Sequence, residues 1–341
     1  MDLFVGISAA IFFVSLVVCL FLIHIANKKG LFLDKIKEDK PQKFHNIDTP
    51  RIGGLAIVMA FLTGSLLFTK NTFAFKLVLA SLPIIIGGFL EDSSIKVPPK
   101  IRLALAFLSA FLAILFTGAV LKGLGFALFT DLPYAVMFAF TIFAVAGVSN
   151  SINIIDGFNG LASGFSLMAL LVFAAASYQL HDKILFEISL TLFFSTFGFF
   201  VLNFPLGKIF LGDGGAYFLG FMLAELSVFL VSRHPDKISP WFCLAVMIYP
   251  VWEVLFSFYR RKFLSGLPAM YPDKMHFHSI FYRKITNSNY KTTLLILAAL
   301  IPFQVGAFFF KYRTSVSLLF ILLFILAYNM SYHAIVWHRK K

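Results

Sequence analysis

The sequence predicts an all-α, polytopic integral membrane protein, and three observations lead to this fold class. Hydrophobic residues make up 60% of the 341 residues and charged residues only 13%, about half the share that is usual in soluble domains. Apolar runs of about 20 residues, long enough for a helix to cross the hydrocarbon core, recur along the chain. No linker, low-complexity tract or clear repeat separates them. We therefore expect one membrane domain, residues 1–341.

Each apolar run is expected to be a helix, because a single segment in lipid satisfies all its backbone hydrogen bonds only in this form. About eleven transmembrane helices are predicted, with ten as the lower count. The runs lie near residues 3–27, 52–69, 74–90, 101–120, 132–149, 160–180, 184–202, 214–231, 241–258, 293–310 and 314–335.

The first run is expected to remain in the protein as a span. No Lys or Arg precedes it, Lys28 and Lys29 follow it, and it has no small-residue cleavage pattern. With the N-terminus outside, the predicted inner segments contain 21 of the 29 Lys and Arg residues, as cytoplasmic segments should. The C-terminus is then cytoplasmic. The net charge of +13 follows from this bias and from attraction to anionic lipid, so no nucleic-acid partner is expected.

Acidic residues stand at the inner ends of the predicted helices, although they are far apart in the sequence. Glu91 and Asp92 close the third run, Asp156 follows the fifth, and Asp213 precedes the eighth. Ionisable residues at the membrane boundary are candidates for function. Two long inner loops, 28–51 and 259–292, are expected to contribute as well. The sequence therefore predicts a site between the helices on the cytoplasmic face.

These residue types are suited to binding phosphate groups. Mg²⁺ takes carboxylate and amide oxygens, usually one or two carboxylates, with water and substrate phosphates completing its shell. Clustered carboxylates repel one another unless a cation lies between them. Basic or imidazole side chains that could bind the phosphates themselves occur in the same inner segments. They are Lys96, Lys100, Arg102, Arg260, Arg261, His276 and His278.

Each motif also has a structural interpretation. A lone acidic pair is more often a solvated helix end, and DGFNG at 156–160 could be an Asx and glycine turn. GDGG at 212–215 lacks the Gly-Lys-Ser/Thr of a Walker motif, and the histidines lack a third soft ligand for zinc. For Glu253 two interpretations stay equally open, a functional residue or a structural partner of Arg260.

Five motifs follow one another on the predicted inner face. They are DKPQKFHNIDTPRIGGLAI (39–57), GFLEDSSIKVPPKIRL (88–103), NSINIIDGFNGLASG (150–164), NFPLGKIFLGDGGAYFLG (203–220) and PDKMHFHSIFYRK (272–284). In this order they resemble the motifs of the polyprenyl-phosphate N-acetylhexosamine-1-phosphate transferases, a superfamily within glycosyltransferase family 4. A single motif would be weak, whereas the ordered set over roughly 39–284 is specific.

The resemblance implies a metal-dependent transferase of the EC 2.7.8 type. A polyprenyl phosphate, expected to be undecaprenyl phosphate, attacks the β-phosphate of a UDP-N-acetylhexosamine such as UDP-GlcNAc. The products are a polyprenyl diphospho-sugar and UMP, the first membrane step of a cell-envelope glycan pathway such as O-antigen (lipopolysaccharide) or cell-wall polymer synthesis. The implied cofactor is Mg²⁺, with Mn²⁺ as a substitute. The implied location is the bacterial inner membrane, and a homodimer is compatible with the resemblance.

The resemblance also implies roles for individual residues. Asp213 and Asp92 are expected to bind the metal, and His276 with His278 to hold the diphosphate or uridine side. The residues expected to be catalytic are Glu91, Asp92, Asp156, His276 and His278. The residues expected to bind substrate are His45, Arg51, Lys96, Lys100, Asn153, Asn159, Arg260 and Arg261.

Two departures from the family pattern narrow these expectations. Glu91 stands where the family has Asp, which leaves open a role as base for the lipid phosphate; that phosphate has a second pKa of about 6 and is largely ionised near neutral pH. The histidine motif reads His-Phe-His-Ser, which argues against a UDP-MurNAc-pentapeptide substrate and for a smaller UDP-sugar. The alternatives are an ion-coupled transporter and a catalytically inactive scaffold of the same fold.

Overall fold

The computed structural model describes residues 2–34, 48–68, 72–125, 132–266, 268 and 273–337. The predicted site residue His45 lies outside these ranges. Within them the regular secondary structure is helical apart from a two-residue antiparallel pairing of β1 (Leu33–Asp34) with β2 (Thr49–Pro50) and an isolated bridge between Arg51 and Phe210. The predicted all-α membrane class is confirmed, and the small strand pair is an addition that the sequence did not indicate.

The helices follow the predicted runs closely. In chain order they are α1 (Asp2–Lys29), α2 (Gly53–Phe68), α3 (Phe73–Asp92), α4 (Pro99–Thr117), α5 (Tyr134–Ile155), α6 (Leu161–Gln179), α7 (Lys183–Asn203), α8 (Gly212–Arg233), α9 (Pro240–Val246), α10 (Ile248–Tyr259), the π-helical turn η2 (Arg260–Leu264), α11 (Phe277–Phe281), the π-helical turn η3 (Tyr282–Thr286), α12 (Asn289–Phe309) and α13 (Thr314–Trp337).

The structure supports fewer full spans than the eleven expected. In the described ranges nine helices are long and apolar enough to cross a membrane, or ten if α9 and the helix after it form one broken span. α2 has only 16 residues, fewer than the about 20 that a perpendicular span needs. The predicted run 241–258 is bent by 79° between α9 and α10. Pro250 explains the break, because it has no N–H to donate to the carbonyl of Val246.

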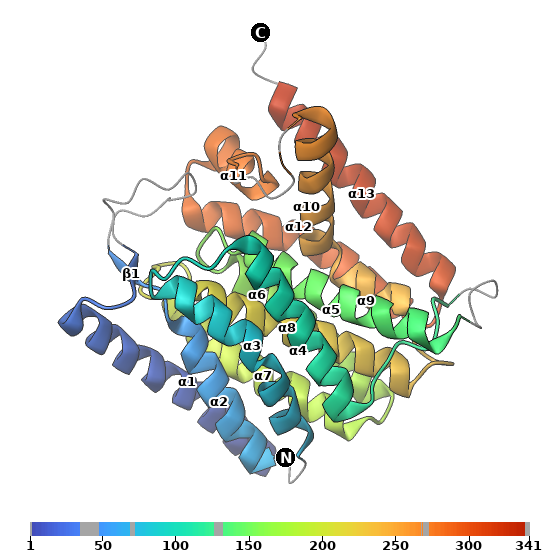
Figure 1. Cartoon of the computed structure of the whole chain (residues 1–341), viewed down its shortest axis with the longest axis horizontal. Coiled ribbons are helices and arrows are strands. Elements are labelled where there is room, and N and C mark those ends of the chain that lie inside the picture. The colour runs from blue at the N-terminus through green and yellow to red at the C-terminus, as the bar shows by residue number, and fades with distance from the viewer. Residues whose placement is uncertain are drawn as a thin grey trace.

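α8 is the central helix and the most deeply buried span. It packs against α2, α3, α5 and α6, and Figure 1 shows it behind α3 and α4 in the middle of the bundle. The α8 backbone comes very close to two neighbours. A Cβ on Gly54 of α2 would lie 2.2 Å from the Gly215 Cα, and a Cβ on Gly88 of α3 would lie 2.4 Å from the Gly214 nitrogen. The motif glycines therefore allow helix contact, as small residues do in membranes.

A buried carboxylate joins α7 and α8 at the end of the bundle opposite to the acidic motifs. Asp182 caps α7 by accepting from the Leu185 N–H at 3.2 Å. It also accepts from Arg233 Nε at 2.7 Å and lies 2.9 Å from His234 Nε2, both at the end of α8. Burial alone would raise the Asp182 pKa, but the hydrogen bonds from Arg233 and His234 hold it below its ordinary value.

Candidate active site

Asp92 and Asp213 meet where the end of α3 contacts the start of α8. One Asp92 oxygen accepts from the Asp213 N–H at 2.8 Å, and the other accepts from the Gly214 N–H at 3.0 Å. Asp92 is buried and thus supplies the cap that α8 lacks from its own sequence. A carboxylate at a helix N-terminus also interacts favourably with the helix dipole. Asp92 therefore fixes the backbone that carries Asp213.

Two arginines bind the Asp213 carboxylate, one on each oxygen. Arg51 Nη2 donates to Oδ1 at 3.0 Å, and Arg102 Nη1 donates to Oδ2 at 2.8 Å. Arg51 also lies 3.6 Å from Asp92, and its backbone bridges to Phe210 just before α8. Burial alone would lower the Arg51 pKa, but the Asp213 and Asp92 carboxylates raise it above its ordinary value. This end of the bundle is an interlocked cluster of acids and arginines.

The loop after α5 brings Asp156 beside this cluster. Burial raises the Asp156 pKa to about 7; Arg51 opposes the rise and Asp213 adds to it. The Asp156 carboxyl therefore interacts electrostatically with Arg51 and Asp213. This interaction agrees with the expectation that the three acids lie at one end of the bundle; their joint role stays a prediction.

Three side chains from other helices hold the same loop in place. The Asn159 N–H donates to Asn289 Oδ1 at 2.9 Å, and Thr293 Oγ1 donates to the Asn159 carbonyl at 2.8 Å. Gly160 has a φ of +76°, a left-handed conformation that favours glycine, and its N–H donates to Asn203 Oδ1 at 2.6 Å. Asn203 Nδ2 in turn donates to the Ile209 carbonyl at 2.8 Å. Asn203 thus couples the Asp156 loop to the segment that leads into Asp213.

His278 packs against the Asp156 loop. Its Nε2 lies 3.1 Å from the position that a Cβ on Gly157 would occupy, so a larger residue at 157 would press on the ring. His278 also stacks on His276, with ring centroids 5.4 Å apart and planes within 1°. Burial lowers the His278 pKa to about 4; Glu253 opposes this shift and His276 adds to it. His278 is therefore a neutral imidazole at physiological pH.

Of the two open interpretations of Glu253, the structure excludes the pairing with Arg260. Glu253 accepts from His276 Nδ1 at 2.9 Å and from the Tyr328 hydroxyl at 2.8 Å. Arg260 instead binds Asp273, with Nη2 at 3.1 Å and 2.9 Å from the two carboxylate oxygens. Asp273 reaches Arg260 Nη2 because it lies in the segment that folds back over the end of α10, three residues before His276. The other interpretation, a functional role for Glu253, stays open.

The remaining predicted residues differ in their surroundings. Glu91 accepts from the Val97 N–H at 2.8 Å and so closes the turn after α3. Lys96 and Lys100 are exposed, whereas Arg261 is buried and donates from Nε to the Ser257 carbonyl at 3.1 Å. Asn153 is partly buried, and its carbonyl accepts from the Asp156 N–H at 3.3 Å.

Three contact residues were not in the predicted site set. Arg102 was noted only as one of several basic residues near the acidic pair, and nothing in its sequence context favoured it over Lys96 or Lys100. Asn203 opens the fourth motif, and its position there was a usable signal. Tyr328 lies in an apolar run near the C-terminus, where no pattern indicated a polar contact.

The described residues contain no group of three His, Cys, Asp or Glu side chains arranged to hold a metal by themselves. Asp213 and Asp156 are nevertheless both carboxylates at this end of the bundle, and they interact electrostatically. Such a pair matches the way Mg²⁺ binds proteins, with few protein ligands and several from water and phosphate. The site thus fits a hard divalent cation whose shell is completed by substrate.

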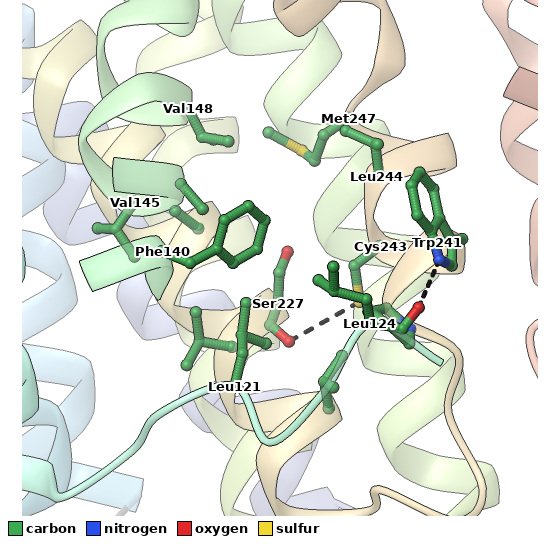
Figure 2. Close-up of a pocket in the computed structure, with 15 residues that line it drawn as sticks. Leu121, Leu124, Phe140, Val145, Val148, Ser227, Trp241, Cys243, Leu244 and Met247 are labelled. Atoms are coloured by element: carbon green, nitrogen blue, oxygen red, sulfur yellow. Dashed lines mark hydrogen bonds between the residues drawn. The ribbon is translucent and has the colours of Figure 1, made fainter. Parts of the chain in front are cut away.

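A mostly apolar cavity of about 150 Å³ lies between α5, α8 and α9, away from this cluster (Figure 2). Trp241 closes one side, and its indole Nε1 donates to the Leu124 carbonyl at 2.7 Å. The α8 residues that line the cavity begin at Ala224, about 16 Å along the helix from Asp213. The cavity has no carboxylate or arginine in its lining and is separate from the polar cluster.

Comparisons with known proteins match the sequence of this chain to one family. A sequence model described as glycosyl transferase family 4 matches residues 74–231. An undecaprenyl-phosphate alpha-N-acetylglucosaminyl 1-phosphate transferase of Thermotoga maritima is 30% identical over 277 residues, which cover 81% of each chain. A probable undecaprenyl-phosphate N-acetylglucosaminyl 1-phosphate transferase of Bacillus subtilis is 29% identical, over 78% of this chain and 75% of the relative. A phospho-N-acetylmuramoyl-pentapeptide-transferase of Lactobacillus johnsonii is 32% identical, over 65% of this chain and 72% of the relative.

Proposed function

Because the chain belongs to glycosyl transferase family 4, we propose that it transfers an N-acetylhexosamine 1-phosphate from a UDP-sugar to polyprenyl phosphate. An oxygen of the lipid phosphate forms a bond to the β-phosphorus of the UDP-sugar, and the bond from that phosphorus to UMP breaks. The relatives support this reaction class by their names. The observation that carries the proposal is Asp213, held between two arginines beside the Asp156 loop.

The proposed metal is Mg²⁺, or Mn²⁺ in its place, held by Asp213 and Asp156. When bound, such a cation supplies charge neutralisation for the diphosphate. Both Asp92 oxygens already accept from backbone N–H groups. We therefore assign Asp92 to holding Asp213 in place, a different role from the metal ligand that the sequence resemblance implied.

Arg51 and Arg102 are proposed to bind phosphate oxygens of the two substrates. A guanidinium matches the geometry of a phosphate and stays charged at any physiological pH. Both arginines reach Asp213 in this structure, so they lie within reach of a diphosphate bound there. Together with the metal they would stabilise the charge that spreads over the transferred phosphoryl group.

The lipid phosphate is proposed to attack without a protein base. Glu91, the residue in the corresponding family position, is engaged with the Val97 N–H. A phosphate with a second pKa of about 6 is already largely ionised near neutral pH. Proton removal is then no barrier, and the protein has only to align two anions.

We propose that the site faces the cytoplasm of a bacterial cell, with the N-terminus outside. Asp92 ends α3, Asp156 follows α5 and Asp213 begins α8, so the cluster lies at helix ends and not at the middle of the bundle. That position supports a meeting point for a membrane lipid and a soluble nucleotide more than the midplane site of a transporter. The excess of Lys and Arg in the same set of loops supports the cytoplasmic side.

The proposed donor is a small UDP-N-acetylhexosamine such as UDP-GlcNAc. The His-Phe-His-Ser motif supports this choice. The N-acetylglucosaminyl relatives also align over a larger share of the chain, 81% for the Thermotoga maritima protein against 65% for the Lactobacillus johnsonii protein. The product would be the first lipid-linked intermediate of a cell-envelope glycan.

The test is to incubate membranes containing the protein with radiolabelled UDP-GlcNAc, polyprenyl phosphate and Mg²⁺. We expect lipid-extractable label that EDTA abolishes and added Mg²⁺ restores. Asp213→Asn should remove the activity and leave the protein folded in detergent, because it changes a ligand atom at a polar site and no core packing. Asp236→Asn, which alters an exposed carboxylate at the opposite end of the bundle, is the matched control. A folded wild-type protein without turnover on any UDP-N-acetylhexosamine would refute the proposal.

A further inference from the structure

Glu253 is a carboxylate with no exposed surface, 0%, in α10 between α13 and the segment that carries the histidines. A buried carboxylate is strongly unfavourable unless hydrogen bonds and charge compensate it. Its partners are His276 Nδ1 at 2.9 Å, the Phe277 N–H at 3.2 Å, the Tyr328 hydroxyl at 2.8 Å and, more distantly, the Ser257 hydroxyl at 3.4 Å. The Ser257 oxygen also lies 3.2 Å from His276 Nδ1. None of these is a Lys or Arg. His276 is therefore the ionisable side chain that Glu253 binds directly.

The two Glu253 oxygens have different tasks. Oε1 accepts from the Phe277 N–H and faces His276 Nδ1, while Oε2 accepts from the Tyr328 hydroxyl. An ionised carboxylate can only accept. Because a backbone N–H and a phenol hydroxyl both donate to it, the proton between Glu253 and His276 belongs to His276 Nδ1. Glu253 thus selects one tautomer of the ring.

Packing fixes the ring in the same orientation. Tyr328 holds the carboxylate from α13 and packs its own ring against Phe277, with centroids 5.0 Å apart. His276 stacks in parallel on His278, which in turn contacts the Asp156 loop. With Nδ1 bound, Nε2 is the remaining polar atom of His276, and it has no hydrogen-bond partner among the residues that the structure describes.

We infer that Glu253 is a positioning residue: it holds His276 with the proton on Nδ1, so that Nε2 accepts a hydrogen bond from an N–H or O–H group of the sugar nucleotide. This inference rests on the proposed function for the identity of the ligand. The tautomer of His276 does not rest on it, so the two can fail separately.

A double-mutant cycle tests the inference with kcat and KM measured for both substrates. We expect Glu253→Leu to lower kcat/KM for the UDP-sugar by about 10- to 100-fold, by analogy with the carboxylates that orient metal-binding histidines. The KM for polyprenyl phosphate should not change. Added to His276→Ala, Glu253→Leu should cause no further loss, because its effect passes through that ring. If the double variant instead loses the product of the two single-variant factors in kcat/KM, the inference is overturned.

Glu253→Gln is the conservative rescue. Its amide oxygen can accept from His276 and Phe277, and its NH₂ can donate to the Tyr328 hydroxyl, which also accepts. It should keep most of the activity that Glu253→Leu loses. A Gln variant as impaired as the Leu variant would overturn the inference, because charge and not tautomer would then matter. Glu225→Gln is the matched control, a carboxylate 1% exposed in α8, about 18 Å along the helix from Asp213.

Nitrogen NMR of selectively labelled histidine reads the tautomer without any turnover. His276→Gln assigns the signal by its disappearance. We expect the wild-type protein to show a protonated Nδ1 and an unprotonated Nε2 at His276. The opposite tautomer would overturn the inference even if Glu253→Leu did not fold. Absence of transferase activity together with the expected tautomer would instead refute the proposed function alone.

Discussion

At the scale of single residues, the acidic side chains of the motifs serve two different purposes. Asp92 and Glu91 give their oxygens to backbone N–H groups and so shape the ends of α3 and α8. Asp213 gives its oxygens to Arg51 and Arg102. Hydrogen bonds to backbone hold a carboxylate in place, whereas arginine partners can be exchanged for a metal or a phosphate. Under the proposed function, Asp213 is the carboxylate whose arginine partners a metal or a phosphate would replace.

Arg102→Ala is expected to lower kcat/KM by at least about 30-fold, since loss of one member of a close charge pair costs about 2–5 kcal/mol. Lys100→Ala should lower it by less than a tenth of that factor, because Lys100 is exposed and carries no contact to Asp213 in the structure. Steady-state kinetics of the two variants side by side make the comparison. A larger loss in the Lys100 variant would contradict the assignment of phosphate binding to Arg102 and favour Lys100 instead.

At the scale of helices, the site depends on how closely α2 and α3 approach α8. The contacts at Gly54 and Gly88 leave no space for a side-chain carbon on either helix. They lie within one turn of Arg51 and Asp92, the residues that reach Asp213. The glycine pairs in these motifs therefore set the distances in the site, and the phosphate-loop appearance of GDGG is incidental.

Gly88→Ala should lower the free energy of unfolding by about 1–3 kcal/mol, the usual effect of an overpacked contact, and should lower kcat with it. The reason is that the added carbon would displace the Gly214 backbone and with it the Asp92 cap. Thermal unfolding in detergent measures the first effect. Gly147→Ala in α5, where the new carbon meets nothing within 4 Å, should cause neither. Equal stability of the two variants would mean that α3 and α8 can move apart at Gly88 without cost, which would contradict the prediction.

Asp182 lets the opposite end of the bundle be tested by pH. Its pKa lies below the ordinary value, so its stabilising effect is complete above the unfolded-state pKa of about 3.9 and is lost as the pH falls through the folded-state pKa. Asp182→Asn keeps a capping side chain but should cost about 1–2 kcal/mol at pH 7, a range reduced because Arg233 is partly exposed. The difference from wild type should shrink as the pH falls through the folded-state pKa of Asp182. Asp236→Asn is the control, and a deficit that persists in acid would contradict the account.

At the scale of the whole molecule, the sequence predicted the helices better than the contacts between them. The run at 214–231 matches α8 (Gly212–Arg233) to within two residues at each end, because apolar length is a local property. The bend at Met247 escaped prediction, since a proline inside an apolar run is common in membrane helices. Arg102 and Asn203 escaped because their roles depend on which helices are neighbours.

The partners of Glu253 were left open for the same reason. Arg260 lies about two helical turns further along the chain, so sequence spacing alone allowed the pair. Asp273 and His276 come from a segment that folds back across α10, and no local pattern reveals such a return. Motif order predicted which segments contribute to the site, and only the fold could assign contacts among their residues.

Cysteine labelling tests the orientation of the whole bundle. Lys96→Cys lies in the turn after Asp92, and Lys183→Cys lies at the start of α7, where the native side chain is 83% exposed. In intact cells a membrane-impermeant maleimide should label the second variant and not the first, and both should react after the membrane is opened. The native Cys19 and Cys243 are buried and should stay silent. Labelling of Lys96→Cys in intact cells would contradict the proposed orientation and place this turn outside the cell.

The Tyr328 hydroxyl that donates to Glu253 belongs to α13, the last helix of the chain that the structure describes. This position has a consequence for the order in which the contacts form during synthesis. A ribosome releases the α3, α5 and α8 parts of the cluster long before the C-terminal span exists. The hydrogen bonds around Glu253 and His276 stay incomplete until that span enters the bilayer. Under the proposed function, synthesis ends by completing the part that would bind the nucleotide, and a nascent chain halted one helix early should be inserted but inactive.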